Sequence, residues 1–317
     1  MSDKRTIVLS GVKPTGRPHI GNYFGAIRQF VEMQDTHDSY VFIANYHALT
    51  TLQNAREMRE NSLSIALDYL AVGLNPEKTV LFKQSDVPQV CELAWIFNCI
   101  TTMPYLARAH AYKDALAKNK ELSVGTFDYP MLMTADILIH DADIVPVGQD
   151  QKQHVEFARD TALKFNRLFA SEIFKLPAPL IVSDVQAVKG IDGQKMSKSY
   201  RNTIPLFATR DELEKLVMGI VTDSEADIPE NVHALHTLFR TESELKDIYE
   251  TNKGKYKALK EALLEDIDAF IAPLREKRAL LEKDIDSVRA VLEQGGKRAR
   301  MRAEEKMEEV RQIIGIR

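Results

Sequence analysis

The first two hundred residues alternate between short apolar runs and amphipathic stretches. Apolar, often β-branched residues fill positions 6–12, 40–44, 79–82 and 143–147, which predicts four buried strands. The stretch 58–70 has the polar and apolar pattern of an amphipathic helix. A further helix is predicted by apolar residues spaced three and four apart, and one face of this helix is expected to pack on the sheet. These residues are Tyr23, Phe24, Ile27, Phe30 and Val31. Such alternation predicts a parallel α/β sheet.

The pattern changes near residues 200–210, after which strand signals stop. Apolar residues then recur at helical spacing in two stripes, one up to Leu274 and one beyond Pro273. The stripes consist of Leu259, Leu263, Ile267, Phe270 and Leu274, and of Leu281, Ile285, Val288 and Leu292. We predict a doubly wound, Rossmann-like parallel-sheet domain over residues 1–203. An all-helical domain is expected over residues 204–317, with a last helix free to pack back on the first domain.

Composition narrows the class of protein. The 317 residues are 44% hydrophobic and 28% charged, which suits a globular chain and argues against disorder or a coiled-coil rod. A formal net charge of −4 gives no global attraction for nucleic acid, so any RNA contact needs a local patch. Cys91 and Cys99 lack C-x-x-C spacing, which argues against a disulfide framework or a four-cysteine metal site. With no leader and no long apolar stretch, we expect a soluble cytoplasmic protein without a membrane partner.

The loop after the first predicted strand is the first candidate for chemistry. Residues 11–22 lack both the G-x-G-x-x-G pattern and the phosphate loop that ends in G-K-[ST]. His19 and Asn22 stand three apart, on one face of a first helical turn, where both can donate hydrogen bonds to phosphate oxygens. Taken alone, the pair is equally typical of an ordinary helix start.

A second candidate is the segment Lys195-Met196-Ser197-Lys198-Ser199, which we call the lysine loop. Gly190 and Gly193 precede it, and the composition predicts a surface loop. Two lysines three apart are usually only a solvated basic face. On their own they do not distinguish phosphate binding from solvation.

Two more segments place polar side chains among apolar ones. Asp136 lies within the apolar helical stretch 129–139, where a buried carboxylate needs a donor, either an internal backbone or arginine partner or a ligand N–H. Residues 145–154 run from a strand end into a helix, with Asp150 and Gln151 at the expected pocket mouth. Asp150 could equally cap that helix.

In combination these segments are specific. His19-Ile20-Gly21-Asn22 followed by the lysine loop resembles the paired signatures of class I aminoacyl-tRNA synthetases. With residues 13–16, 129–138 and 145–154, almost the whole chain resembles the tryptophanyl-tRNA synthetases. The resemblance implies activation of L-tryptophan with ATP to the adenylate, release of pyrophosphate, and transfer to the 3′ end of tRNA(Trp). It also implies a cytoplasmic homodimer, and Mg²⁺ carried with ATP; an iron–sulfur cluster would need four cysteines, and the chain has two.

The resemblance also implies roles for individual residues. The expected catalytic residues, which stabilise charge on the α-phosphate and on pyrophosphate, are His19, Asn22, Lys195 and Lys198. ATP is expected against Lys13, Pro14, Thr15, Gly21, Asn22, Gly148, Gln149, Asp150, Lys195, Met196, Ser197, Lys198 and Ser199. Tryptophan is expected at Asp136, which accepts the indole N–H, at Tyr129 and Gln151, which hold the amino and carboxyl groups, and at the pocket lining Met133, His47, Val145 and Val147. No residue is expected to ligate a metal directly.

Other functions compete with this one. A tyrosyl-tRNA synthetase could use Asp136 to bind a phenol O–H, although the segment 148–154 argues against it. A non-catalytic paralogue would have lost the histidine, asparagine or lysine signatures, and all are present. A small-molecule nucleotidyltransferase would not need the helical domain.

The sequence also offers one local cationic cluster, near the end of the predicted helical domain. It consists of Lys297, Arg298, Arg300 and Arg302. Such a cluster is consistent with tRNA phosphate binding or with a solvated helix face.

Overall fold

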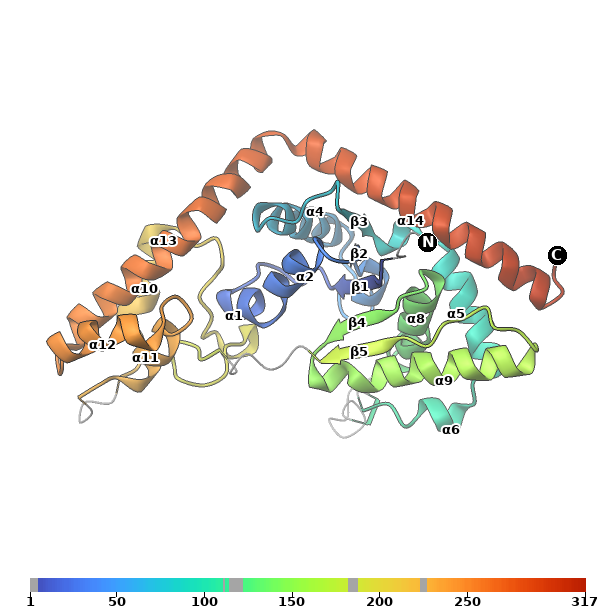
Figure 1. Ribbon diagram of the computed structural model, residues 1–317, viewed down its shortest axis with the longest axis horizontal. Coiled ribbons are helices and arrows are strands. Elements are labelled where there is room, and N and C mark those ends of the chain that lie inside the picture. Colours follow the sequence, from blue (N-terminus) through green and yellow to red (C-terminus); the bar gives the residue numbers. More distant parts are fainter. Residues whose placement is uncertain (1–4, 111, 114–121, 182–187, 223–226) are drawn as a thin grey trace.

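The computed structural model describes residues 5–110, 112–113, 122–181, 188–222 and 227–317, and its centre is a parallel sheet (Figure 1). The five strands run in the order β3-β2-β1-β4-β5. Their bounds are β1 (Ile7–Val12), β2 (Asp38–Ile43), β3 (Thr79–Lys83), β4 (Ile144–Val147) and β5 (Ala178–Ile181). The predicted parallel α/β sheet is therefore confirmed, with a fifth strand that the apolar pattern did not mark.

Helices surround the sheet and then continue alone. Up to residue 203, in what we call the sheet part, they are α1 (Ile20–Asn22), the π-helical turn η1 (Tyr23–Ile27), α2 (Arg28–Met33), α3 (Asn45–Ala48), α4 (Ala55–Ala71), η2 (Gln84–Asp86), α5 (Gln89–Ile100), α6 (Met103–Leu106), α8 (Val124–Ile139), η3 (Gln149–Gln151), α9 (Lys152–Leu168) and η4 (Lys198–Tyr200). From residue 204 onward, in the helical part, they are α10 (Arg210–Met218), α11 (Glu230–His236), α12 (Glu242–Thr251), α13 (Tyr256–Lys283) and α14 (Ile285–Ile313).

Both faces of the sheet are buried, each in its own core. Val41 and Ile43 join one core together with residues of α4, while Phe42 between them joins a second core with residues of α5, α8 and α9. The split follows from the pleat, since successive side chains of a strand point to opposite faces. Helices on both faces explain why the strands are continuous apolar runs.

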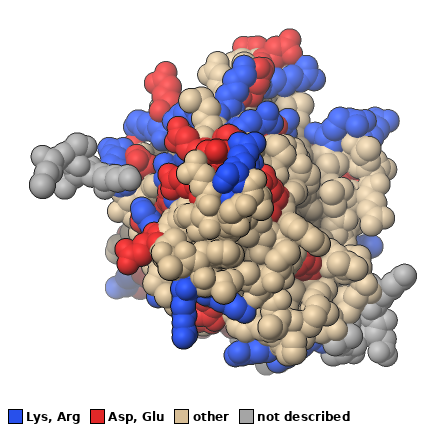
Figure 2. Space-filling model, turned by 90° about the vertical axis from the view of Figure 1, so that its right-hand side faces the viewer, with Lys and Arg blue, Asp and Glu red and all other residues tan. Residues whose placement is uncertain are grey.

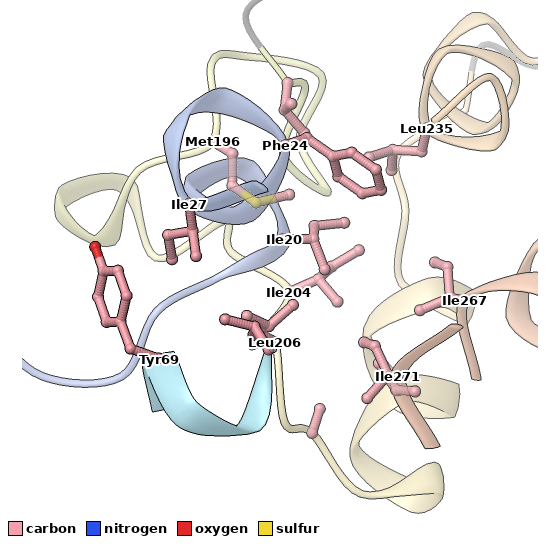
Figure 3. Packing of buried hydrophobic residues seen from close by; sticks show 14 of the residues in the cluster. Ile20, Phe24, Ile27, Tyr69, Met196, Ile204, Leu206, Leu235, Ile267 and Ile271 are labelled. Carbon is pink, nitrogen blue, oxygen red and sulfur yellow. The ribbon is translucent and has the colours of Figure 1, made fainter. Parts of the chain in front are cut away.

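The first of these cores continues into the helical part (Figure 3). Ile20 and Phe24 share it with Leu235 and with Ile267 of α13. Phe24 belongs to the core that includes Val41 and Ile43 of the sheet, but the centre of its ring also lies 5.4 Å from that of Phe239, a contact with the helical part that was not predicted. Periodicity identifies a buried face but not the element that buries it.

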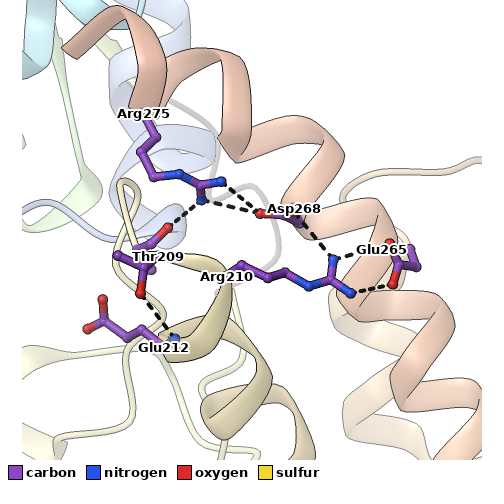
Figure 4. Close-up of polar contacts among 7 residues, drawn as sticks. Thr209, Arg210, Glu212, Glu265, Asp268 and Arg275 are labelled. Carbon is purple, nitrogen blue, oxygen red and sulfur yellow. Dashed lines mark hydrogen bonds and ion pairs between the residues drawn. The ribbon is translucent and has the colours of Figure 1, made fainter. Parts of the chain in front are cut away.

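A polar cluster fastens the start of α10 to α13 (Figure 4). Arg275 donates to the carbonyl oxygen of Ala208 at 2.6 Å and to Asp268 at 3.1 Å. Arg210 pairs with Asp268 at 3.3 Å and with Glu265. Thr209 caps α10, because its side-chain oxygen accepts the N–H of Glu212 at 3.2 Å.

The two long C-terminal helices link the ends of the molecule (Figure 1). Helix α13 continues through Pro273 to Lys283, so the two helices are separated at Asp284, and Leu281 of the second stripe belongs to α13. Helix α14 then runs back along β3, the edge strand of the sheet. The helix approaches so closely that a Cβ on Gly295 would lie 1.9 Å from the carbonyl oxygen of Leu81. Only glycine allows this contact.

The cationic cluster of α14 lies in this contact. Arg300 donates to the carbonyl oxygen of Asp86 at 2.7 Å, and Arg302 to that of His140 at 2.9 Å. Lys297 pairs with Glu293 at 2.7 Å. The two arginines therefore contact backbone carbonyls of the sheet part, a role that neither of the two alternatives for this cluster included.

Among the described residues, no helix is both long enough and apolar enough to cross a membrane.

Candidate active site

The candidate site lies at β1, where the order in which strands are added to the sheet reverses. Strands β2 and β3 extend to one side of β1, and β4 and β5 to the other. In such sheets, ligands bind at the carboxyl ends of the strands at this switch point. The loop after β1 carries residues 13–19, and the turn after β4 carries residues 148–151. Two of the predicted segments therefore meet at one edge of the sheet.

His19 and Asn22 form a reciprocal capping box at the start of α1. The Nδ1 atom of His19 accepts the N–H of Asn22 at 3.2 Å, and Oδ1 of Asn22 accepts the N–H of His19 at 3.1 Å. Because Nδ1 accepts, the ring proton belongs on Nε2, which is then a donor. The pKa of His19 is lowered to about 4 by burial and by the nearby charge of Lys198. His19 is therefore a neutral donor at pH 7.

The lysine loop lies against the loop after β1. The Nζ atom of Lys198 donates to the carbonyl oxygens of Thr15 at 2.9 Å and of Gly16 at 3.1 Å. Gly16 has φ +83°, a conformation that favours glycine. Burial lowers the pKa of Lys198, and the charge of Asp68 opposes that shift. The two segments, some 180 residues apart in the chain, are thus joined by a cation and two backbone carbonyls.

Met196 anchors the same loop. It is 5% exposed and shares the first core with Ile20, Ile204 and Leu206 (Figure 3). A Cβ on Gly21 would lie 3.4 Å from its sulfur and 3.0 Å from Nδ1 of His19. Glycine at position 21 leaves room for both side chains. The loop is therefore held by its apolar residue while the side chains of Lys195, Lys198 and Ser199 stay exposed.

Asp136 lies at the other side of the site, 3% exposed on α8. Its oxygens accept both contacts from Nε2 of Gln84, at 2.8 and 2.9 Å, and one from Nε2 of His47 at 2.9 Å. Burial raises the pKa of Asp136, while the hydrogen bonds from His47 and Gln84 oppose that rise. Asp136 therefore has internal donors, but they are the side chains of Gln84 and His47 and not the backbone or arginine partner that was one of the two alternatives. Since a carboxylate has about four lone-pair sites, one remains for a ligand N–H.

Gln84 was missed by the sequence reasoning. Its Oε1 atom accepts the N–H of Tyr46 at 3.0 Å and that of His47 at 3.3 Å, while its Nε2 holds Asp136. The amide is 1% exposed and follows directly after β3. Its place at the carboxyl end of a strand is the signal that could have identified it.

Tyr129 contacts His154, His47 and Lys13. The hydroxyl of Tyr129 lies 2.8 Å from Nε2 of His154, and the Tyr129 ring lies edge to face with that of His47 at 6.2 Å. The Nζ atom of Lys13 lies 5.7 Å from the centre of the Tyr129 ring, and burial lowers its pKa. Lys13 therefore lies next to Tyr129, its ammonium group facing the aromatic ring.

The remaining predicted residues are placed as follows. Val145 and Val147 are buried in β4, and Met133 is half-buried on α8. Gly148 and Gln151 are half-buried in the turn after β4, where the side chain of Gln149 is exposed. The side chain of Asp150 lies outside the described part of the chain. Within that part, no group of three or more histidine, cysteine, aspartate or glutamate side chains could hold a metal ion.

Comparison with known proteins agrees with this arrangement. The family model of class I tRNA synthetases for tryptophan and tyrosine matches residues 1–285. The chain belongs to this family. It is 49% identical over 316 residues to a tryptophan–tRNA ligase of Fusobacterium nucleatum, covering 97% of both chains. It is 45% identical to the enzyme of that name from Rhodopirellula baltica, covering 98% of this chain and 99% of that one.

A solved member of the family has the same fold. The crystal structure of tryptophanyl-tRNA synthetase from Campylobacter jejuni, complexed with ADP and tryptophan, superposes with a TM-score of 0.92 at 44% identity. The superposition covers 98% of this chain and 100% of that one. The predicted Rossmann-like sheet with a helical extension is therefore the fold of the family. A tyrosyl-tRNA synthetase from Archaeoglobus fulgidus, 19% identical with a TM-score of 0.64, shares the fold alone.

Proposed function

We propose that this chain is a tryptophan–tRNA ligase, which activates L-tryptophan with ATP and transfers the tryptophanyl group to the 3′ end of tRNA(Trp). The near full-length identity of 49% to a ligase of this name carries the proposal. The geometry is consistent with it, because the buried carboxylate of Asp136 and the donors of His19, Asn22 and the lysine loop come from segments that follow strands of the sheet or lie against them. A tyrosyl-tRNA synthetase is the competing function, and it is supported only by the shared fold and by the family model, which covers both amino acids.

The first step joins the tryptophan carboxylate to the α-phosphorus of ATP and releases pyrophosphate. Negative charge builds up on the α-phosphate oxygens and on the leaving group, so fixed donors lower the barrier. We assign this role to Nε2–H of His19, to the side-chain amide of Asn22, and to the ammonium groups of Lys195 and Lys198. His19 is suited to it because it stays neutral, with its proton directed away from the capping contact. No protein nucleophile is needed.

Tryptophan selection is assigned to the α8 side of the site. Asp136 has one acceptor position left after its contacts with Gln84 and His47, and we assign it to the indole N–H. Tyr129 and Gln151 are proposed to hold the amino and carboxyl groups. The proposed lining of the indole pocket is Met133, His47, Val145 and Val147.

ATP is proposed to lie along the loop after β1, the turn after β4 and the lysine loop. The proposed contacts are Lys13, Pro14, Thr15, Gly21, Asn22, Gly148, Gln149, Asp150 and residues 195–199. Lys198 now bonds the carbonyl oxygens of Thr15 and Gly16, and phosphate oxygens would replace these partners. Mg²⁺ is proposed to arrive with the phosphates, where it would neutralise part of their charge.

The second step requires tRNA(Trp), and we propose a division of labour between two domains. Residues 1–203 form the catalytic domain, and residues 204–317 form the domain that contacts the anticodon. We place the enzyme in the cytoplasm, where its two exposed free thiols would stay reduced. An iron–sulfur cluster is not proposed, since four thiolates would be needed.

We propose that the enzyme acts as a homodimer through the outer face of α5. Cys91, Trp95 and Cys99 stand four residues apart on this helix and are all exposed, as is Met103 just beyond it; Trp95 is 70% exposed. Figure 2 views the side on which α5 and the end of α14 lie in Figure 1, and tan side chains form a broad area there, bordered by charged ones. Exposed apolar areas of this kind are typical of protein interfaces. Light scattering of wild type and Trp95→Glu tests it, with a dimer and a monomer expected.

The test of the activity is exchange of labelled pyrophosphate into ATP without tRNA, with tryptophan and tyrosine supplied separately. Exchange with tryptophan alone is the expected result. Exchange with tyrosine alone would overturn the assigned amino acid and leave the adenylate chemistry standing. No exchange with either amino acid would overturn the proposed activity.

A further inference from the structure

A buried amide at the base of the lysine loop holds the loop in shape. Asn202 is 1% exposed and follows three residues after Ser199. Its Oδ1 atom accepts the N–H of Ser197 at 2.8 Å, and its Nδ2 donates to the carbonyl oxygen of Lys195 at 3.1 Å. One carboxamide therefore holds the backbone on both sides of Met196, between the two lysines of the loop.

The surroundings fit a planar amide. Its Nδ2 also donates to Oδ1 of Asp192 at 2.7 Å, and the same oxygen accepts the N–H of Gln194 at 3.0 Å. A Cβ on Gly190 would lie 2.4 Å from Cγ of Asn202, so glycine is required opposite the amide. Both donors and the acceptor of Asn202 are thus used: two of these contacts are to the backbone of the lysine loop, and the third is to Asp192, which precedes the loop.

The chain from Asn202 leads directly to the other signature. Two residues later, the carbonyl oxygen of Ile204 accepts the N–H of Ile20 at 3.0 Å, and the N–H of Leu206 donates to the carbonyl oxygen of Pro18 at 3.0 Å. These bonds bracket His19, which pairs with Pro205. The position of the lysines relative to His19 and Asn22 therefore depends on a short extended segment whose first residue is Asn202.

We propose that Asn202 is a positioning residue for adenylate formation: its carboxamide sets the backbone of Lys195 and Ser197 so that both ammonium groups of the loop reach the phosphates of ATP. The proposal rests on the phosphate-binding role proposed above for Lys195 and Lys198. Asn202 has no contact with the Asp136 pocket among its hydrogen bonds, so tryptophan binding should not depend on it.

The test separates rate from binding. For Asn202→Ala, we expect the kcat of pyrophosphate exchange to fall about tenfold or more, since small misplacements of charged groups are costly in the transition state. Tryptophan binding without ATP, measured by equilibrium dialysis, should stay within about twofold. Asn166→Ala is the matched control, because Asn166 makes the same kind of two-way contact with Phe174, at 2.8 and 3.2 Å, in a loop after α9. We expect it to lower the melting temperature without a selective loss of exchange.

Exchanging the residue types at positions 202 and 192 tests the contact between Asn202 and Asp192 without removing either side chain. Asn202→Asp keeps an acceptor for Ser197 but places a second carboxylate against Asp192, so exchange should fall. Adding Asp192→Asn restores a donor and an acceptor across the same 2.7 Å contact, and exchange should partly recover. If Asn202→Ala does not fold, this pair still decides the question.

Each result has a definite meaning. Exchange by a folded Asn202→Ala within about twofold of wild type would overturn the positioning role, as would an equal loss in Asn166→Ala or no recovery in the swapped pair. The proposed function is judged separately, by Lys195→Ala and Lys198→Ala. If these lose exchange while Asn202→Ala does not, the lysines act without Asn202; if they keep exchange, the phosphate role of the loop itself is wrong.

Discussion

The side of the site proposed to bind tryptophan and the side proposed to bind the phosphates are built by different means. On the tryptophan side, Asp136 is 3% exposed and already holds hydrogen bonds from Gln84 and His47. On the phosphate side, Lys195 and Lys198 are exposed, and the lysine loop is held by Met196 and by a few bonds to backbone. If the proposed roles hold, the side chain assigned to tryptophan recognition is fixed by burial and hydrogen bonds before substrate arrives, whereas the charges assigned to the phosphates are presented from the surface. Substitutions on the two sides should therefore affect different quantities.

The largest effect is expected on the tryptophan side, from Asp136→Asn. The amide turns one acceptor into a donor that faces Gln84 or His47, and it removes the charge that would hold the indole N–H. Losing a charged hydrogen bond and opposing two buried donors should lower kcat/KM for tryptophan by about 10² to 10³-fold. Exchange kinetics and equilibrium dialysis measure it.

Asp128→Asn on the same helix is the control for that substitution. Asp128 accepts a hydrogen bond from Asn98 at 2.8 Å, on a different contact from that of Asp136. We expect near wild-type exchange from it. Unchanged tryptophan binding in Asp136→Asn would contradict the role assigned to that carboxylate.

On the phosphate side, Lys198→Ala should lower the kcat of exchange by about 10 to 10²-fold, by removing a charge that stabilises the transition state. Tryptophan affinity should not change, because the pocket around Asp136 is separate. Lys189→Ala serves as the control, since Lys189 lies just before the loop and pairs with Glu230 instead. An equal loss of tryptophan affinity and rate would argue that the two sides are not separable.

The two sides of the site differ in how many of their residues could be predicted from the sequence. The signatures around His19 and Lys195 were predicted as one site, because short, ordered patterns identify them. The role of Gln84 was not predicted, since a lone glutamine after a strand has no periodic signal. Strand β5 was not marked either: it has four residues, and prolines at positions 177 and 179 weaken the strand pattern. The partner of Phe24 depends on packing between segments far apart in the chain, which local pattern cannot supply.

A smaller effect should follow from Gln84→Ala, which removes a support of the tryptophan side without touching the carboxylate. Asp136 loses a donor, and the N–H groups of Tyr46 and His47 lose an acceptor. We expect a loss of about 1 to 3 kcal/mol of unfolding free energy and a rise in the tryptophan KM of about tenfold. Chemical denaturation and exchange kinetics measure these. A change in stability with no change in KM would limit Gln84 to a structural role.

The smallest effect is expected from the titration of His19 on the phosphate side. The pKa of His19 is about 4 in the folded chain and near 6.5 in the unfolded one, so the unfolded state binds the extra proton between these values. Stability from this group is therefore full above about pH 6.5 and declines as pH falls toward 4. His140, whose pKa burial lowers to about 3, adds to the same decline. His19→Gln should flatten the pH dependence of unfolding relative to wild type, and an unchanged slope would contradict a neutral His19.

The return of α14 to the sheet has a consequence for synthesis of the chain. The outer strand β3 is translated about 200 residues before α14, the helix that covers it and contains Gly295. An uncovered strand edge is a surface on which chains pair with one another. The edge of the nascent sheet therefore stays open until α14 has been synthesised, and a ribosome that stalls shortly before residue 295 would release a product with an open, aggregation-prone edge.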